Sequence, residues 1–176
     1  MSILHGFSEP RDMLYKLLRD GRKCHIAESV ECKFDHLFNF VVTGHSIRDW
    51  CIDFLNLDGA GKNAFHIRCN QSEYLEYCRD IANTSKHFRL SDGVRSVSNV
   101  ASAQEEYVDL DGDFNKIPGT EQKKNSAMIV LPSNEEVELF YFIHGVISQF
   151  KTIFTEYDIP YDKEKMHLNY LVAVHI

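Results

Sequence analysis

The chain has 176 residues, of which 44% are hydrophobic and 26% are charged. This composition is typical of an ordinary globular protein and excludes a disordered or fibrous chain, and the length predicts a single domain over residues 1–176. The 19 Lys and Arg against 26 Asp and Glu give a net charge of −7 and a pI near 5.7. An acidic chain of this kind argues against a dedicated DNA-binding module, which would normally be basic.

Features of location and cofactor binding are absent from the sequence pattern. No run of about 18 apolar residues occurs, so we expect no membrane span. The opening Met-Ser-Ile-Leu-His lacks the basic and apolar stretches of a secretory signal. Without that signal, five cysteines, an odd number, predict reduced thiols and a cytoplasmic location. No Cys-x-x-Cys or His-Glu-x-x-His spacing is present, so we expect no metal and no other cofactor.

The first ninety residues show the three-and-four spacing of apolar side chains that is typical of amphipathic helices. This spacing predicts helices over residues 9–27, 30–56 and 72–89. Pro10 suits the first turn of the first helix, because proline lacks the N–H that would be unsatisfied there. Ser29 and Ser72 are candidate N-caps for the second and third helices. The stretch Leu57–Asn63, which contains two glycines, is expected to be a loop.

The pattern changes after Leu90 to one that is typical of short strands. Alternating and apolar runs are separated by the turn dipeptides Asp111-Gly112 and Pro118-Gly119. They predict a small antiparallel β insertion over residues 94–132. A further alternation from Leu168 to Val174 is compatible with a final strand.

The last helix is expected over residues 133–157. Ser133 and Glu136 match a capping box, and apolar side chains follow at helical spacing. The expected fold is therefore mostly α, a four-helix bundle with a small antiparallel β insertion before the last long helix.

The third predicted helix carries the side chains that are best suited to catalysis. At 100° per residue, four polar side chains share one face: Arg79, Asn83, Lys86 and His87. Four apolar side chains lie opposite: Tyr74, Tyr77, Ile81 and Phe88. A neutral imidazole can take the proton of a ribose 2′-hydroxyl, and neighbouring cations can stabilise charge on a phosphoryl group. The alternative is an ordinary solvent-exposed helix face, which any surface helix has.

The second predicted helix offers a supporting set. His45, Asp49 and Asp53 recur at intervals of four and share a face, with Arg48 beside them. Asp49 could hold a histidine tautomer or pair with Arg79 across the bundle. An exposed ladder of charged side chains is the alternative interpretation.

Two familiar motifs are approached but not matched. Asp109–Asn115 is similar to a calcium loop, but its glycine comes too early, so we interpret it as a hairpin turn. Gly59–Lys62 lacks the full spacing of a P-loop and follows no strand, so we interpret it as a helix connection.

The stretch Ala82-Asn83-Thr84-Ser85-Lys86-His87 resembles the Arg-Asn-x-x-Lys-His variants of the motif in HEPN-domain proteins. Those proteins are four-helix bundles, often dimeric, and many are metal-independent ribonucleases of toxin–antitoxin and antiphage systems. The resemblance implies a homodimer whose polar face lines a cleft that binds RNA, with Asn83, Lys86 and His87 in the motif's places. The chain departs from the motif at Ala82, where the family has arginine. Arg79 could substitute for it, and a degenerate, non-catalytic domain is equally compatible.

The same helix is also similar to one in uncharacterised bacterial and phage proteins that carry Ala-Asn-x-x-Lys-His-Phe. In those proteins, too, a β insertion and a last helix follow, and the similarity implies no known activity.

Two functions of different classes therefore remain. The first is a metal-independent endoribonuclease or a degenerate relative, with His87 as general acid and base and with Arg79, Asn83 and Lys86 contacting phosphate. The second is a non-catalytic module that binds another protein through its acidic second half. Residues 1–90 hold 12 basic and 12 acidic residues, whereas residues 91–176 hold 7 and 14. The acidic surplus thus belongs to the second half alone, and leaves the helical half free to contact phosphate.

Overall fold

The computed structural model describes residues 5–84, 95–113, 115–167 and 171. Within them the helices are α1 (Pro10–Ile26), α2 (Val30–Phe54), α3 (Gly59–Asn70), α4 (Glu73–Asn83), α5 (Leu139–Glu156) and the short 3-10 helix η1 (Glu164–Met166). The strands are β1 (Asn99–Tyr107), β2 (Gln122–Val130) and β3 (Glu136–Glu138), joined as one antiparallel sheet in that order. The prediction of a mostly helical chain with a small antiparallel sheet before the last long helix is confirmed.

The predicted helix starts are formed by the expected side chains. Pro10 occupies the first position of α1, where the Asp12 carboxylate accepts the backbone N–H of Glu9 at 3.0 Å. The Ser29 hydroxyl oxygen accepts the N–H of Cys32 at 3.1 Å, and that of Ser72 accepts the N–H of Leu75 at 3.5 Å. Each serine or aspartate thus satisfies a backbone donor that the helix itself leaves open.

The expected loop over Leu57–Asn63 is wrong, because α3 begins at Gly59. Its glycines suggested a loop, but burial of Phe65 and Cys69, four residues apart, favours a helix there. The Phe65 ring packs edge-on against Tyr157 with centroids 5.0 Å apart. Tertiary packing of this kind outweighs the modest cost of glycine in a helix.

The expected start of the last helix at residue 133 is also wrong. The hydroxyl of Ser133 donates to the Glu135 carboxylate at 3.0 Å, in a tight turn, instead of capping a helix. Glu136–Glu138 forms β3, which pairs with β2, and α5 begins only at Leu139. Strand pairing with β2 therefore outweighs the local capping signal. The predicted third helix extends to Asn83 with Thr84 as its C-cap, and residues 85–89 of its predicted range lie outside the described residues. The possible strand over Leu168–Val174 also lies outside them, apart from Leu171.

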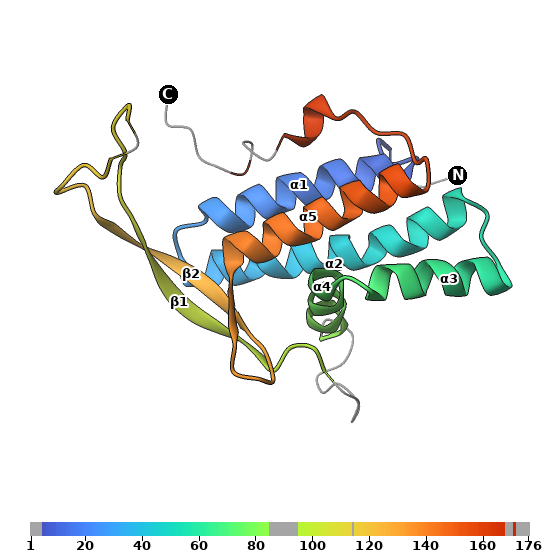
Figure 1. The fold of residues 1–176 in the computed structure, drawn as a ribbon, viewed down its shortest axis with the longest axis horizontal. Coiled ribbons are helices and arrows are strands. Elements are labelled where there is room, and N and C mark those ends of the chain that lie inside the picture. Colours follow the sequence, from blue (N-terminus) through green and yellow to red (C-terminus); the bar gives the residue numbers. More distant parts are fainter. Residues whose placement is uncertain (1–4, 85–94, 114, 168–170, 172–176) are drawn as a thin grey trace.

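The contacts between α1, α2, α4 and α5 form a closed ring. α1 packs on α2 and α5, and α4 packs on α2 and α5 from the other side, with α3 against α2 and α4. Figure 1 shows α1, α2 and α5 running side by side, whereas α4 is seen nearly end-on and so crosses them steeply. No helix in the described part of the chain has the length and apolarity that crossing a membrane would require.

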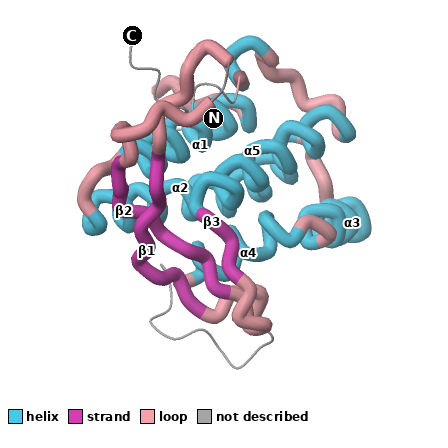
Figure 2. The backbone as a smooth tube through the Cα atoms, turned by 60° about the vertical axis from the view of Figure 1, so that its left-hand side comes forward, coloured by secondary structure: helices cyan, strands magenta, loops and turns pink. Residues whose placement is uncertain are grey.

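The sheet extends from the helices as a long hairpin. β1 and β2 pair without a bulge from Asn99↔Val130 to Tyr107↔Gln122. Its base packs on α2 and α5 through β2, and Figure 1 shows its far end projecting beyond the helices. Figure 2 shows the three strands lying together along one side of the helical layer.

Two glycines allow α4 to cross its neighbours closely. A Cβ on Gly44 of α2 would lie 2.8 Å from the Cys78 sulfur of α4, and a Cβ on Gly145 of α5 would lie 2.5 Å from the Tyr74 ring. A real Cβ atom essentially never makes contacts this short, so a side chain at either position would displace Cys78 or Tyr74. The crossing is therefore built into α2 and α5 as well as into α4.

We predict that Gly145→Ala lowers the free energy of unfolding by about 1–3 kcal/mol, because the Tyr74 ring must move out of a packed site. Urea unfolding followed by circular dichroism measures this. Gly61→Ala is the matched control. Its Cβ meets only Leu57 at 3.5 Å, so it should stabilise α3 by up to about 1 kcal/mol. Equal stability of the two variants would contradict the close crossing.

Candidate functional site

The structure places two of the four predicted catalytic side chains on one flank of α4. The Arg79 side chain is 27% exposed, and Asn83 is half-buried in the last turn of the helix. Lys86 and His87 lie outside the described residues, so their part in the site stays a prediction.

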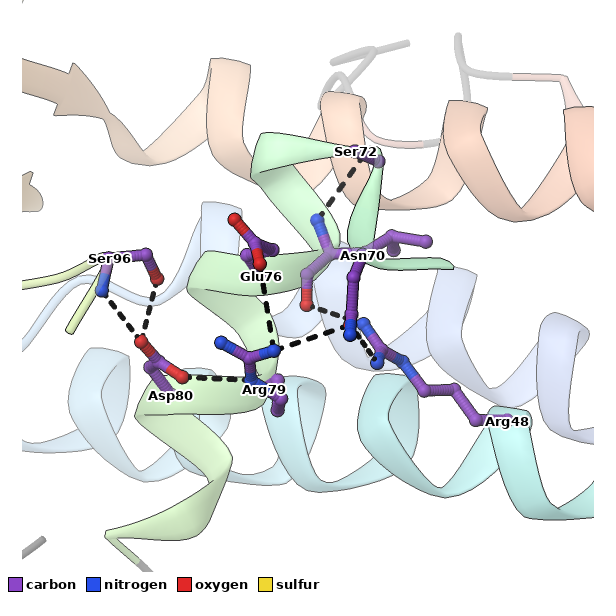
Figure 3. A network of polar contacts seen from close by, with 8 residues as sticks. Arg48, Asn70, Ser72, Glu76, Arg79, Asp80 and Ser96 are labelled. Atoms are coloured by element: carbon purple, nitrogen blue, oxygen red, sulfur yellow. Dashed lines mark hydrogen bonds and ion pairs between the residues drawn. The ribbon is translucent and has the colours of Figure 1, made fainter. Parts of the chain in front are cut away.

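The Arg79 guanidinium is surrounded by acceptors from its own chain, as Figure 3 shows. Its Nε donates to the Asp80 carboxylate at 2.9 Å, and one terminal nitrogen lies 3.6 Å from the Glu76 carboxylate. The same nitrogen donates to the Asn70 side-chain oxygen at 3.3 Å. Two carboxylates therefore already neutralise the positive charge of Arg79, which would otherwise be available to bind a phosphate group.

A second arginine, Arg48 of α2, also contacts Asn70. It is 4% exposed and donates to the Asn70 side-chain oxygen at 2.8 Å and to the Leu75 carbonyl oxygen at 2.9 Å. Burial lowers the pKa of this guanidinium, which nevertheless stays charged. Figure 3 shows Asn70 between the two arginines. Arg48 thus ties α2 to the junction of α3 and α4, a structural role.

Asp80 joins the polar flank of α4 to the segment that leads into β1. The carboxylate, 8% exposed as a residue, accepts both the backbone N–H and the hydroxyl of Ser96 at 2.8 Å each. Burial alone would raise its pKa, but the hydrogen bonds from Ser96 and from Arg79 lower the pKa of Asp80 below the ordinary value. Asp80 is therefore a charged side chain whose hydrogen bonds connect α4 to the segment before β1.

The buried side of α4 differs from the predicted one. Tyr77 is buried as expected, but Leu75, Cys78 and Ala82 are at most 2% exposed and form a second buried strip. The sequence pattern did not show this because α4 is covered by both α2 and α5, whereas we assumed one buried face. Ala82, the position at which the HEPN motif has arginine, thus lies in the core.

Among the supporting residues on α2, Asp49 forms no ion pair with Arg79 in the part of the chain that the structure describes. His45 is half-buried and Asp49 is exposed. Within the described residues, the ion pairs of Arg79 are with Glu76 and Asp80 rather than with Asp49. The structure thus gives Asp49 the features of an exposed helix face.

A different group of side chains gathers at the far end of the β1–β2 hairpin, which we call the hairpin tip, residues 108–121. Leu110 is 51% exposed and Ile117 38%. Four acidic residues surround them in this segment: Asp109, Asp111, Asp113 and Glu121. The Asp111 carboxylate accepts the backbone N–H groups of Asp113 and Asn115 at 2.9 and 2.8 Å, which makes it a turn residue. The tip is therefore acidic with an apolar centre.

The cysteines and the acidic residues form no reactive or metal-binding group in the described residues. No three His, Cys, Asp or Glu side chains gather there closely enough to hold a metal ion. Four of the five cysteines are buried, and Cys32 is exposed. Burial raises the pKa of the Cys24 and Cys78 thiols to about 12, so both are protonated and unreactive at neutral pH.

Comparisons with known proteins give no match: no family model, no curated protein and no solved structure matches the chain. The HEPN resemblance therefore stays a prediction, and the function has to be argued from the geometry.

Several hydrogen-bond partners at this site were missed from sequence: Asn70, Asp80 and Ser96. Asn70 and Ser96 lie outside α4, and only the fold brings Asn70 to Arg79 and Ser96 to Asp80. The one available signal was the adjacency of Asp80 to Arg79 in the sequence, which is common and carries little information.

We predict that Ala82→Arg, which would restore the arginine of the HEPN motif, destabilises the fold by about 3 kcal/mol or more, because it places an uncompensated charge in the core. Ala64→Arg, at an exposed alanine of α3, is the control and should change the stability by less than about 0.5 kcal/mol. Chemical denaturation of both variants measures the difference. A stable Ala82→Arg protein would show that position 82 can hold a functional arginine.

Proposed function

We propose that the chain is a non-catalytic protein-binding module and that the hairpin tip docks onto a basic surface of its partner. The observation that carries the proposal is the tip itself, where exposed Leu110 and Ile117 lie among acidic residues at the end of a projecting hairpin. An apolar centre with a charged surround is the usual anatomy of a protein interface.

The hairpin is fixed to the helices at the end that carries the tip. On β2, the Asn125 side chain donates to the Glu28 carbonyl oxygen, between α1 and α2, at 3.0 Å. The Tyr107 ring of β1 lies 6.4 Å from the His25 ring of α1. Within the hairpin, the Glu105 carboxylate accepts the hydroxyl groups of Ser126 at 2.5 Å and of Tyr107 at 2.6 Å. These contacts order the last residues before the tip, and pre-ordering of this kind favours binding.

The acidic charge of the tip gives the expected partner its character. Residues 108–121 contain one basic residue, Lys116, and four acidic residues, so the tip carries a net negative charge. A basic patch on the partner would steer the encounter and place an apolar pocket over Leu110 and Ile117.

The second candidate is a HEPN-like endoribonuclease, or a degenerate relative, in a bacterial or phage defence or toxin–antitoxin setting. Two observations support it: Arg79 and Asn83 share a flank of α4, and the chain is mostly helical with a small sheet before the last long helix. Against it stand the carboxylates on Arg79 and the burial of Ala82. The two candidates differ in whether the purified chain cleaves RNA, and a homodimer is compatible with both.

The binding proposal is tested by co-purification from cells that express a tagged chain. We predict a partner that is recovered with the wild type and reduced about tenfold by the combined changes D109N, D113N and E121Q, which leave the turn residue Asp111 intact. The single change L110S should reduce it as well.

The matched control combines E31Q, D35N and D53N, which remove the same charge from exposed positions of α2 and should leave recovery unchanged. If every recovered protein is insensitive to the tip changes, or equally sensitive to the control, the hairpin tip is not the binding surface.

A further inference from the structure

We propose that the outer edge of β1 pairs with the same edge of a second copy of the chain, so that two three-stranded sheets join into one across a two-fold axis. The proposal concerns a different surface from the hairpin tip and from the polar flank of α4.

The edge is open in the described residues. β1 lies at the end of the strand order and pairs only with β2, and the helices pack on the sheet mainly through β2 and β3. Every second backbone N–H and C=O of an edge strand points away from its neighbour. β1 is nine residues long, or about 30 Å at the rise of a strand, so it offers a long row of such groups.

Over residues 99–104 the edge also lacks the features that normally prevent pairing. Natural edge strands carry charged side chains, especially Lys, or a Pro or a bulge, or are very short. β1 has no Lys or Pro, pairs with β2 without a bulge, and its residues 99–104 are uncharged. The opposite edge of the sheet differs: β3 covers residues 128–130 of β2, and the uncovered part carries Lys123 and Lys124. One edge is therefore protected and the other is left able to pair.

The charges on β1 favour a copy of the chain over a basic strand. Glu105 and Glu106 lie opposite Lys124 and Lys123 of β2, and Glu106 forms an ion pair with Lys123 at 3.6 Å. The acidic residues of the edge thus already have basic neighbours within the sheet.

Antiparallel self-pairing meets no electrostatic conflict. If all nine residues pair, Ala103 lies on the two-fold axis, and Glu105 and Glu106 face the uncharged Ala101 and Val100 of the second copy. Ser102 then faces Gln104 of the second copy, and both side chains are exposed.

The experiment measures the mass of the chain in solution by sedimentation over about a hundredfold range of concentration. The wild type should reach twice the 20.4 kDa chain mass. The pair S102K and Q104K places like charges opposite each other twice and should raise the dimer Kd about tenfold or more. The pair S102K and Q104E, at the same positions, places opposite charges together and should keep the dimer.

A second measurement does not depend on charge. Because residues that face each other across antiparallel strands have Cα atoms about 4.5–5.5 Å apart, Ala103→Cys should cross-link to itself under mild oxidation. The exposed Cys32 is replaced by serine in every variant, and Gln104→Cys, two residues out of register with itself, is the control.

A wild type that stays monomeric throughout overturns the proposal and leaves the edge to a strand of another protein. So does a dimer that neither the lysine pair nor Ala103→Cys affects, because its interface must then lie elsewhere.

Discussion

The close crossing of α4 over α2 and α5 is the constraint on which the rest of the structure depends. Gly44 and Gly145 remove the side chains that would otherwise hold α4 away, so Cys78 and Tyr74 pack directly on the two neighbouring helices. With both sides buried, α4 exposes only a narrow flank, and its polar side chains are drawn together there. Arg79, Asp80 and Glu76 therefore satisfy one another, and Asp80 clasps Ser96 on the way into β1. These contacts of Glu76, Arg79 and Asp80, the polar flank of α4, connect the helices to the segment that leads into the sheet.

We propose that the hairpin carries the recognition surface of the molecule. Glu105, Ser126 and Asn125 order the part of the hairpin next to its tip, and the tip presents Leu110 and Ile117 among acidic residues. The buried polar groups of the helical part are largely occupied by one another: Asp20 accepts from Lys16 and Thr43, and Lys33 donates to the carbonyl oxygens that end α1. Groups that are already bonded stabilise an interior and have little capacity left for a ligand.

Much of the fold could be predicted from the sequence, and the failures have physical causes. Local signals located α1 and α2 and the hairpin, because Pro10, Ser29 and the turn dipeptides act within a few residues. α3 and β3 were missed because each is stabilised by distant partners, Phe65 by Tyr157 and Val137 by the strand opposite, and local glycine or capping signals pointed elsewhere. For the site, helical spacing correctly put Arg79 and Asn83 on one flank. It could not show that Asn70 and Ser96 come to meet Arg79 and Asp80, or that a second helix buries Ala82.

We propose that the polar flank of α4 is structural and that the chain acts by binding. The test is incubation of the purified wild type and His87→Ala with single-stranded and structured RNA in the presence of a metal chelator. We expect both proteins to leave the RNA intact over the whole time course, at any concentration that permits pairing of two chains. Cleavage by the wild type that His87→Ala abolishes, while keeping the wild-type stability, would contradict the account and establish the ribonuclease.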